Sequence, residues 1–382
     1  MQLQQIELTD FRNFSKLSIE GLSPGVNSII APNGSGKSNL LEAIYVTAIG
    51  SSPRTKHLRE SIRWGTKLGR VVLAGDQEKL EVRISEQGRR LYRFDGEINL
   101  REMMTHLSVV LFQPPDLNLI AGNPSLRRKY LDRLMGQISF DYLHELINYR
   151  RYLDQRNHLL RIPASDPIHL GTIEEQVATS GAVIIRSRAD LISRINSRAL
   201  GAGINLKYLP SPRIVREITE NYMREISADQ DYLLSERAKK AGVSFAGNLR
   251  ELLREKLSEM REREMQLGFS LIGPQRDDFT VSMGKVFHRA VDINVAMYGS
   301  RGEQRMAIVL LKTIECDLIE ESKTVRPLLL LDDVLSELDE GNRGRMFDLV
   351  QKQQTFLTAT DDAVIPAFIP HNSRIYLNKI SS

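Results

Sequence analysis

Short alternating or apolar runs near both ends of the chain predict β-strands. The expected strands lie at residues 2–8, 26–30, 71–74, 80–84, 90–94, 269–272, 279–283 and 328–331. Turns at 87–88 and 95–96 join the runs between residues 70 and 99 into a predicted antiparallel sheet. A glycine-rich loop and a helical stretch at 38–49 follow the second strand.

The middle of the chain has a helical pattern, in which apolar residues recur at intervals of three and four among many charges. The expected helices lie at residues 125–136, 140–161, 172–200, 229–241 and 248–267. We therefore expect an α/β domain made of residues 1–118 and 269–382. An all-helical insertion of residues 119–268, the arm, would interrupt it.

The composition is that of an ordinary globular protein, with 41% hydrophobic and 26% charged residues among 382. The net charge, 52 − 48 = +4, is too small to indicate nucleic-acid binding by itself. A single cysteine, Cys316, excludes an intramolecular disulfide and fits a reducing compartment. No signal-peptide pattern opens the chain, and no apolar run approaches the ~20 residues that cross a bilayer. We expect a cytoplasmic protein without a membrane partner.

Residues 31–38 follow the phosphate-loop pattern G-x-x-x-x-G-K-[ST] between a predicted strand and a predicted helix. They are Ala31, Pro32, Asn33, Gly34, Ser35, Gly36, Lys37 and Ser38. Small residues let backbone N–H groups converge on phosphate, and the helix N-terminus adds partial positive charge. We expect Lys37 to reach the β- and γ-phosphates of ATP and the Ser38 hydroxyl to bind Mg²⁺.

Ala31 stands where this pattern has its first glycine. If the position needs a conformation suited to glycine, alanine costs about 1 kcal/mol there. The alternative interpretation is a chance glycine-serine loop between a strand and a helix. The lysine and serine that directly follow Gly36 favour the phosphate loop.

A second motif is an unbroken apolar run that ends in Asp332 and Asp333. It predicts a buried parallel strand, and ligands of open α/β sheets bind at the carboxyl ends of the strands. We expect Asp332 to hold Mg²⁺ and Asp333 to orient or activate an attacking water. The alternative is a buried strand that merely ends at an acidic turn. The motifs lie 332 − 37 = 295 residues apart, so a large insertion must separate them.

A third candidate site begins an apolar helical pattern. Its residues are Ser300, Arg301, Gly302, Glu303 and Gln304. A hydroxyl, bare backbone and a helix dipole together form an anion site. Simple capping, with Ser300 and Glu303 as a capping box, is the alternative. The position shortly before the acidic strand favours the anion site.

Together these motifs resemble the ABC-type P-loop ATPase head, with mixed sheets and flanking helices, shared by ABC transporters, SMC proteins, Rad50 and RecF. In that resemblance 31–38 is the Walker A motif, 300–304 the signature motif and 328–333 the Walker B motif. Residues 336–339 resemble the D-loop, which implies a catalytic role for Asp339, and Gln113 lies near the Q-loop position. Segments that resemble the RecF family in particular are 10–14, 39–45, 155–157, 273–278 and 331–339.

The resemblance implies a homodimer whose two heads close on ATP. Lys37 of one head and residues 300–302 of the other would grip the same triphosphate. Slow hydrolysis would reopen the dimer and so gate a DNA clamp. The resemblance further implies binding to double-stranded and gapped DNA. With RecR and RecO, such proteins help load RecA onto single strands in recombinational repair, replication restart and the SOS response.

The chain departs from the family pattern at a few positions. RecF proteins usually have glycine at Ala31, threonine at Ser38 and histidine at Gln275. Thr358-Ala-Thr360 stands where ABC proteins often place a histidine that senses the γ-phosphate. Asp333 is also shorter than the glutamate that most ABC enzymes use, which favours slow hydrolysis.

Basic residues supply further candidates. Arg54 and Lys56 are the candidate DNA contacts, because lysine and arginine neutralise backbone phosphates. Arg12 is a candidate for the nucleotide, because its guanidinium suits phosphate oxygens. The alternative for these basic residues is that they simply belong to a solvent-exposed helical face.

Three other functions are compatible with parts of this pattern. Another SMC or Rad50-type ATPase would need a long coiled coil, which Pro163, Pro167, Pro210 and Pro212 exclude. A transporter ATPase subunit carries a smaller helical insertion than this chain. A non-catalytic, ATP-gated DNA clamp, which uses ATP only to hold the dimer together, would have the same motifs, so the sequence does not exclude it.

Overall fold

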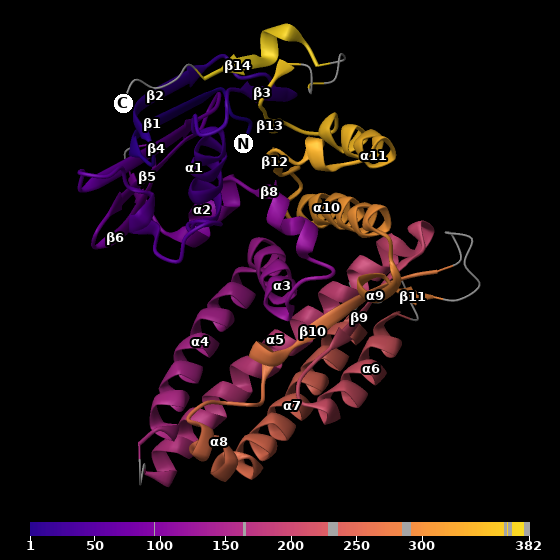
Figure 1. Cartoon of the computed structure of the whole chain (residues 1–382). Helices are drawn as coiled ribbons and strands as arrows, with labels where there is room; N and C mark the ends of the chain where they lie inside the picture. The colour runs from indigo at the N-terminus through magenta and orange to yellow at the C-terminus, as the bar shows by residue number, and fades with distance from the viewer. Residues whose placement is uncertain are drawn as a thin grey trace. The chain divides into compact units, whose positions relative to one another are not determined.

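In a computed structural model of the protein, the described residues are 1–94, 96–162, 166–227, 236–284, 292–362, 365 and 369–377. The chain divides into two compact units (Figure 1). Unit 1 joins Met1–Leu117 to Ile308–Ser382, and unit 2 is Asn118–Ala307. None of the helices in the described part of the chain is long and apolar enough to cross a membrane.

The first sheet of unit 1 is antiparallel and has the strand order β2-β1-β4-β5-β6-β7. Its strands are β1 (Gln5–Phe11), β2 (Phe14–Glu20), β4 (Leu68–Ala74), β5 (Lys79–Ser85), β6 (Gly88–Arg93) and β7 (Gly96–Ile98). Alternate residues such as Ile6, Leu8 and Val82 are buried, so one face of the sheet covers the core. The predicted antiparallel sheet is therefore confirmed, although the predicted turn residue Asp95 lies outside the described residues.

The second sheet of unit 1 is parallel and has the strand order β14-β3-β13-β12-β8. Its strands are β3 (Val26–Ile30), β8 (Val109–Phe112), β12 (Leu328–Leu331), β13 (Thr355–Ala359) and β14 (Arg374–Tyr376). The residues of β3, β8, β12 and β13 are all buried, as expected for a parallel sheet covered on both faces. Because the pairing is parallel throughout, the carboxyl ends of these strands lie along one edge.

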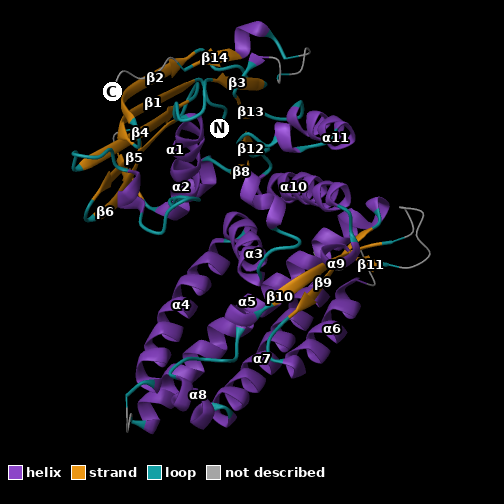
Figure 2. Ribbon diagram, in the orientation of Figure 1, coloured by secondary structure: helices purple, strands orange, loops and turns teal. Residues whose placement is uncertain are grey.

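Helix α1 (Lys37–Ile49) lies between the two sheets of unit 1 (Figure 2). Its apolar residues join side chains from both sheets and from α2 (Leu100–His106) in one hydrophobic core. Leu328 and Leu330 of β12 belong to this core, whereas the alternate residues Leu329 and Leu331 face the other way. Unit 1 also contains α11 (Glu340–Val350) and most of α10 (Arg301–Lys323), which begins in unit 2.

Unit 2 is mainly helical. Its helices are α3 (Pro124–Ile138), α4 (Phe140–Leu160), α5 (Pro167–Ala199), α6 (Arg213–Ser227), α7 (Glu236–Glu259), α8 (Arg261–Leu267) and α9 (Val295–Tyr298). Helix α5 packs against α4, α6 and α7, so it forms the centre of the unit. It starts where the sequence provides a cap, because Asp166 accepts a hydrogen bond from the Ile168 N–H and Pro167 takes the first helical position.

Two expectations about unit 2 need correction. The arm is not all-helical, because β9 (Ile204–Leu209), β10 (Asp278–Met283) and β11 (Ile293–Asn294) form an antiparallel sheet. Since β10 pairs with β9, residues up to 307 group with unit 2, whereas we expected the arm to end at residue 268. Helix α6 was not predicted, and the first part of the expected helix 229–241 lies outside the described residues.

The strand predicted at 269–272 is wrong, because the segment is a loop. Side chains of unit 2 satisfy its backbone instead of a neighbouring strand. The Ser270 N–H donates to Asn157 Oδ1 (2.8 Å), and the Leu271 N–H donates to Glu264 Oε1 (2.6 Å). A segment with an alternating apolar pattern becomes a β-strand only if a neighbouring strand supplies partners for its backbone hydrogen bonds.

A buried ionic cluster holds the same region of unit 2 together. Arg156 of α4 is fully buried, and its guanidinium lies 2.9 Å from Glu174 and 2.6 Å from Glu264. It also donates to Ser270 Oγ at 2.7 Å. Arg261 adds a second cation beside Glu174 at 2.6 Å. Charges removed from water need such partners, because an unpaired buried ion is strongly destabilising.

We predict that Arg156→Met destabilises the protein by about 3–5 kcal/mol, because it leaves buried carboxylates without their main cation. Urea unfolding of the full chain, followed by far-ultraviolet circular dichroism, measures the change. The matched control is Arg254→Met, since Arg254 is exposed and lies 3.8 Å from Glu175. That variant should change the stability by less than about 1 kcal/mol. Equal effects of the two substitutions would contradict the role of the cluster.

Candidate functional site

The edge of the parallel sheet in unit 1 brings distant segments of the chain together. The loop 31–36 follows β3, the pair Asp332 and Asp333 follows β12, and Gln113 follows β8. Thr358 lies near the end of β13, between β3 and β12. The Asp332 N–H donates to Phe112 O at 2.9 Å, so the ladder continues to this edge. This geometry brings the two sequence motifs together at one edge of the sheet.

Two glycines shape the loop that leads into α1. Gly34 has φ +81° and Gly36 has φ +103°, a region that favours glycine. A Cβ on Gly36 would lie 2.6 Å from Asn13 Nδ2 and 2.8 Å from Phe14 Cζ. Ala31 is not among the residues with a positive φ, so alanine fits that position without the backbone strain considered above. The loop therefore needs glycine at position 36 but not at position 31.

The side chain of Lys37 folds back onto the phosphate loop and binds its backbone carbonyl groups. Its buried ammonium donates to Ala31 O at 2.8 Å and Pro32 O at 3.3 Å, and lies 3.5 Å from Asn33 Oδ1. These neutral acceptors leave the positive charge of Lys37 uncompensated by any carboxylate among the described residues. The Ser35 hydroxyl is also buried, and no described residue accepts or donates a hydrogen bond there. A charged lysine and an orphan hydroxyl in a loop of this shape suit an anion.

The acidic pair faces the first turn of α1. Ser38 Oγ donates to Asp332 Oδ1 at 2.8 Å. Thr358 Oγ1 lies 3.1 Å from both Asp332 Oδ1 and Asp333 Oδ1, and it accepts the Asp333 N–H at 2.8 Å. Asp333 itself has φ +52°, an uncommon backbone conformation for a residue with a side chain. Thr358 therefore contacts the acidic pair from the segment in which ABC proteins often have a histidine that senses the γ-phosphate.

Burial raises the pKa of Asp332, and the negative charge of Asp333 adds to this effect. The hydroxyls of Ser38 and Thr358 oppose the shift, because they stabilise the carboxylate by hydrogen bonding. The balance is a carboxylate that lacks sufficient positive charge nearby. Its oxygens and the Ser38 hydroxyl are hard ligands that fit Mg²⁺, which usually takes only one or two protein ligands beside phosphates and water.

Arg12 does not point freely into the phosphate loop. It has φ +53° in the turn between β1 and β2, and its guanidinium grips the buried carboxylate of Glu42 in a bidentate contact of 2.9 and 2.5 Å. A third hydrogen bond joins it to Glu60 O at 2.7 Å. Arg54 also lies near this carboxylate, at 3.5 Å, and donates to Asn39 Oδ1 at 2.6 Å. Both arginines are thus anchored to α1.

Other predicted site residues lie elsewhere. Asp339 caps α11, because its carboxylate accepts from the Asn342 N–H at 2.9 Å. In unit 2, Ser300 and Glu303 form the capping box considered above, with the Ser300 N–H 2.7 Å from Glu303 Oε2 and the Glu303 N–H 3.2 Å from Ser300 Oγ. The Gln113 N–H donates to Asp116 Oδ2 at 3.1 Å. Lys56 is exposed on the loop after α1.

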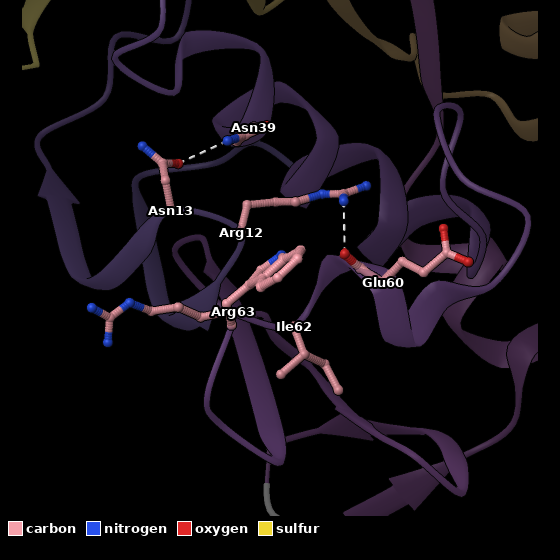
Figure 3. A pocket seen from close by; sticks show the side chains of 7 residues that line it. Arg12, Asn13, Asn39, Glu60, Ile62 and Arg63 are labelled. Atoms are coloured by element: carbon pink, nitrogen blue, oxygen red, sulfur yellow. Dashed lines mark hydrogen bonds between the residues drawn. The ribbon is translucent and has the colours of Figure 1, made fainter. Parts of the chain in front are cut away.

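Sequence reasoning missed a cavity of about 430 Å³ beside the phosphate loop. Its lining residues are Arg12, Asn13, Asn39, Glu60, Ile62, Arg63 and Trp64, and all except the tryptophan are labelled in Figure 3. Asn13 connects it to the loop, because its Nδ2 donates to Ser35 O at 3.1 Å. Trp64 is 96% exposed. A lone tryptophan between arginine and glycine was the signal that could have indicated this site.

We predict that Asp332→Asn stabilises the ligand-free protein at neutral pH. A raised folded pKa means that the stability contributed by Asp332 is present below its ordinary value of 3.8 and is lost as the pH rises through the folded pKa. Asparagine stays neutral and can still accept from Ser38, so it removes this loss. Urea unfolding at several pH values should show an advantage that shrinks on acidification. The exposed Asp76→Asn is the control, and a pH-independent difference would contradict the prediction.

Comparisons with known proteins place the chain in a family. The model of the RecF/RecN/SMC N terminal domain matches residues 2–367. The DNA replication and repair protein RecF of Limosilactobacillus fermentum is 36% identical, with 98% of this chain and 97% of that protein covered. The protein of the same description from Geobacillus kaustophilus is 34% identical over 98% of this chain and 97% of its own length.

Solved structures agree with this placement. A structure of the recombination mediator protein RecF-ATPrS in the RecFOR pathway has a TM-score of 0.77 and 26% identity, and the match covers 95% of this chain and 94% of that one. A structure of RecF-ATP has a TM-score of 0.75 and 26% identity, with 96% and 93% covered. The ABC-type head with a largely helical insertion is thus confirmed as the fold. The chain belongs to the RecF family, within the wider group of RecF, RecN and SMC proteins.

Proposed function

We propose that the protein binds ATP with Mg²⁺, dimerises on ATP, and acts on DNA in recombinational repair and replication. The observation that carries this proposal is the 2.8 Å hydrogen bond between Ser38 Oγ and Asp332 Oδ1. It joins the glycine loop to the acidic strand at the sheet edge where α/β folds bind ligands. The RecF-ATP and RecF-ATPrS structures show that similar proteins bind such nucleotides.

The phosphates would lie over residues 31–38. Lys37 would exchange its present acceptors, Ala31 O and Pro32 O, for phosphate oxygens. A charged acceptor makes a stronger hydrogen bond with an ammonium than a neutral carbonyl does. The backbone N–H groups of Gly34 and Gly36, with the start of α1, would complete the cradle.

Ser38 and Asp332 would hold Mg²⁺, which when bound neutralises charge on the phosphate oxygens. Asp333 would orient the attacking water, and Thr358 would keep both carboxylates in place through its hydroxyl. A short aspartate and a threonine at these positions favour slow hydrolysis. The non-catalytic clamp differs from this proposal only in turnover. Phosphate release over many cycles, with and without gapped DNA, separates the two.

The cavity beside the loop would take the base of the nucleotide. Its volume of about 430 Å³ suits a ligand of this size, and it joins the phosphate loop through Asn13. Trp64 offers an exposed aromatic face on which a base can stack. Arg12 would contribute by shaping this cavity and anchoring α1 through Glu42, rather than by direct phosphate contact.

The second half of the nucleotide site would come from another copy of the chain. Ser300, Arg301 and Gly302 start α10, and Glu303 now caps the Ser300 N–H. In the dimer the partner's γ-phosphate would replace this carboxylate as the acceptor, because a helix N-terminus attracts anions. Gln304 would belong to the signature motif that contacts the partner's nucleotide. Gln113 would lie near the attacking water, and Asp339 would contribute to the contact between the two heads.

DNA is the proposed macromolecular ligand, in double-stranded and gapped form, with Arg54 and Lys56 as contacts. RecR, RecO and RecA are the proposed partners, so that the protein helps load RecA onto single strands. The relatives described as DNA replication and repair proteins, and the structures assigned to the RecFOR pathway, support this part. It would act in the cytoplasm.

We predict that Lys37→Ala abolishes ATP binding and ATP-dependent dimerisation. Calorimetric titration with ATP and Mg²⁺ measures the first. Light scattering with ATP, with ADP and without nucleotide measures the second. Lys16→Ala, at an exposed lysine of β2, should behave as the unaltered protein. Normal ATP binding by the Lys37 variant, or a monomer that persists with ATP, would overturn the proposal.

We predict that ATP changes the fluorescence of Trp64, which is the single tryptophan of the chain and therefore an unambiguous probe. Trp64→Ala should weaken ATP binding by about 5- to 150-fold, as expected if about 1–3 kcal/mol of base stacking is lost. Trp64→Phe should keep most of the affinity. The control is Phe94→Ala, at another exposed aromatic residue of unit 1. Unchanged affinity in Trp64→Ala would exclude the cavity as the base site.

A further inference from the structure

A second hollow, of about 400 Å³, opens at the other end of α1. Three segments line it, namely residues 50–52, 56–59 and 85–89. Helix α1 has 13 residues, so at about 1.5 Å per residue the hollow lies about 20 Å from the phosphate loop. We call it the distal groove. It belongs entirely to unit 1 and is separate from the nucleotide site.

The distal groove carries an excess of positive charge. Lys56, Arg59 and Arg89 line it, with Glu86 as the only carboxylate among its lining residues. Within the described part of the chain, no carboxylate forms an ion pair with any of these three cations. Other arginines of the same sheet are paired, since Arg70 and Arg83 both bind Glu81 and Arg93 binds Glu78. The groove therefore concentrates cations that the protein itself does not neutralise.

Strand geometry directs Arg89 into the groove. Arg89 pairs with Ile84 across the strands, and cross-strand partners share a face of the sheet. Ile84 is fully buried, so this is the face that carries α1. The Arg89 guanidinium lies over Gly50, where a Cβ would come within 3.0 Å of its Nε. Arg90 points the other way, and its nearest carboxylate is Glu97 at 3.9 Å.

The environment of Arg89 is also compatible with an anionic ligand. Burial lowers the pKa of Arg89, and no carboxylate opposes that shift. The C-terminus of α1 near Gly50 carries partial negative charge, which can stabilise the positive charge of one side chain, Arg89. It does not account for Lys56 and Arg59, which lie on the loop and the short 3₁₀ helix (Leu58–Ser61) beyond the end of α1. Leu58 is the single large apolar residue of the lining, so an apolar small molecule is a poor fit.

We propose that the distal groove binds the sugar-phosphate backbone of duplex DNA, with Lys56, Arg59 and Arg89 as phosphate contacts. The inference rests on the DNA-binding part of the proposed function and names the surface responsible for it. Lysine and arginine side chains with small and hydroxyl-bearing neighbours match a phosphodiester chain, and such contacts carry no sequence preference. In the sequence, Arg54 lies between the groove-lining segments 50–52 and 56–59, and its side chain contacts Glu42 and Asn39 of α1.

The test compares two triple variants that remove equal charge. The groove variant is Lys56→Gln, Arg59→Gln and Arg89→Gln. The control is Lys16→Gln, Lys67→Gln and Lys79→Gln, at exposed lysines of unit 1 outside the groove. Anisotropy of a labelled duplex of arbitrary sequence, with ATP and increasing KCl, gives the slope of log affinity against log salt. The groove variant should reduce that slope by about 2.7, or about 0.9 for each lost contact, and the control by much less.

Further measurements separate the groove from the nucleotide site and from misfolding. ATP binding, followed by Trp64 fluorescence, should be unchanged in the groove variant. Arg89→Lys should restore most of the slope that Arg89→Gln loses, because the charge is kept. If the triple variant unfolds, the exposed single variant Lys56→Gln should still lower the slope by about 0.9. Equal loss in the groove and control variants overturns the groove proposal alone. Absence of duplex binding by the unaltered protein overturns the DNA part of the proposed function as well.

Discussion

The site depends on one constraint, which is the parallel pairing of β3, β13, β12 and β8. Parallel pairing places the carboxyl ends of all these strands at one edge, so segments from both ends of the chain meet there. The hydrogen bond from Ser38 to Asp332 spans 294 residues and exists only because β13 holds the two strands in register between them. Without that register, neither motif would have a partner.

This arrangement concentrates unfavourable features at the same edge. Asp332 is half-buried and forms no ion pair within the described part of the chain, Asp333 adopts a strained backbone, and the buried Ser35 hydroxyl has no hydrogen-bond partner there. Each feature costs stability in the free protein, and each suits a nucleotide and a cation. The ionic cluster around Arg156 in unit 2 shows the contrast, because there the buried charges compensate each other.

Helix α1 links the features of unit 1. Its N-terminus forms the phosphate loop, its buried Glu42 anchors Arg12 and Arg54, and its C-terminal glycine makes room for Arg89 in the distal groove. The core packs this helix between two sheets, so its position is set by apolar contacts with both. A rigid helix of this kind holds the proposed nucleotide and DNA surfaces at a constant spacing.

The sequence by itself determined the elements whose patterns are long or chemically specific, such as β3, β12, α1, the phosphate loop and the acidic pair. These depend on local periodicity and on glycine conformations, which neighbouring residues express. Tertiary structure decided the rest. The apolar segment 269–272 became a loop, and β9 paired with β10. Arg12 formed an ion pair with Glu42, and Trp64 came to lie beside Asn13 and the phosphate loop. The physical reason is that these outcomes depend on partners far away in the chain, and no local pattern specifies which partner a strand, a charge or an aromatic ring will meet.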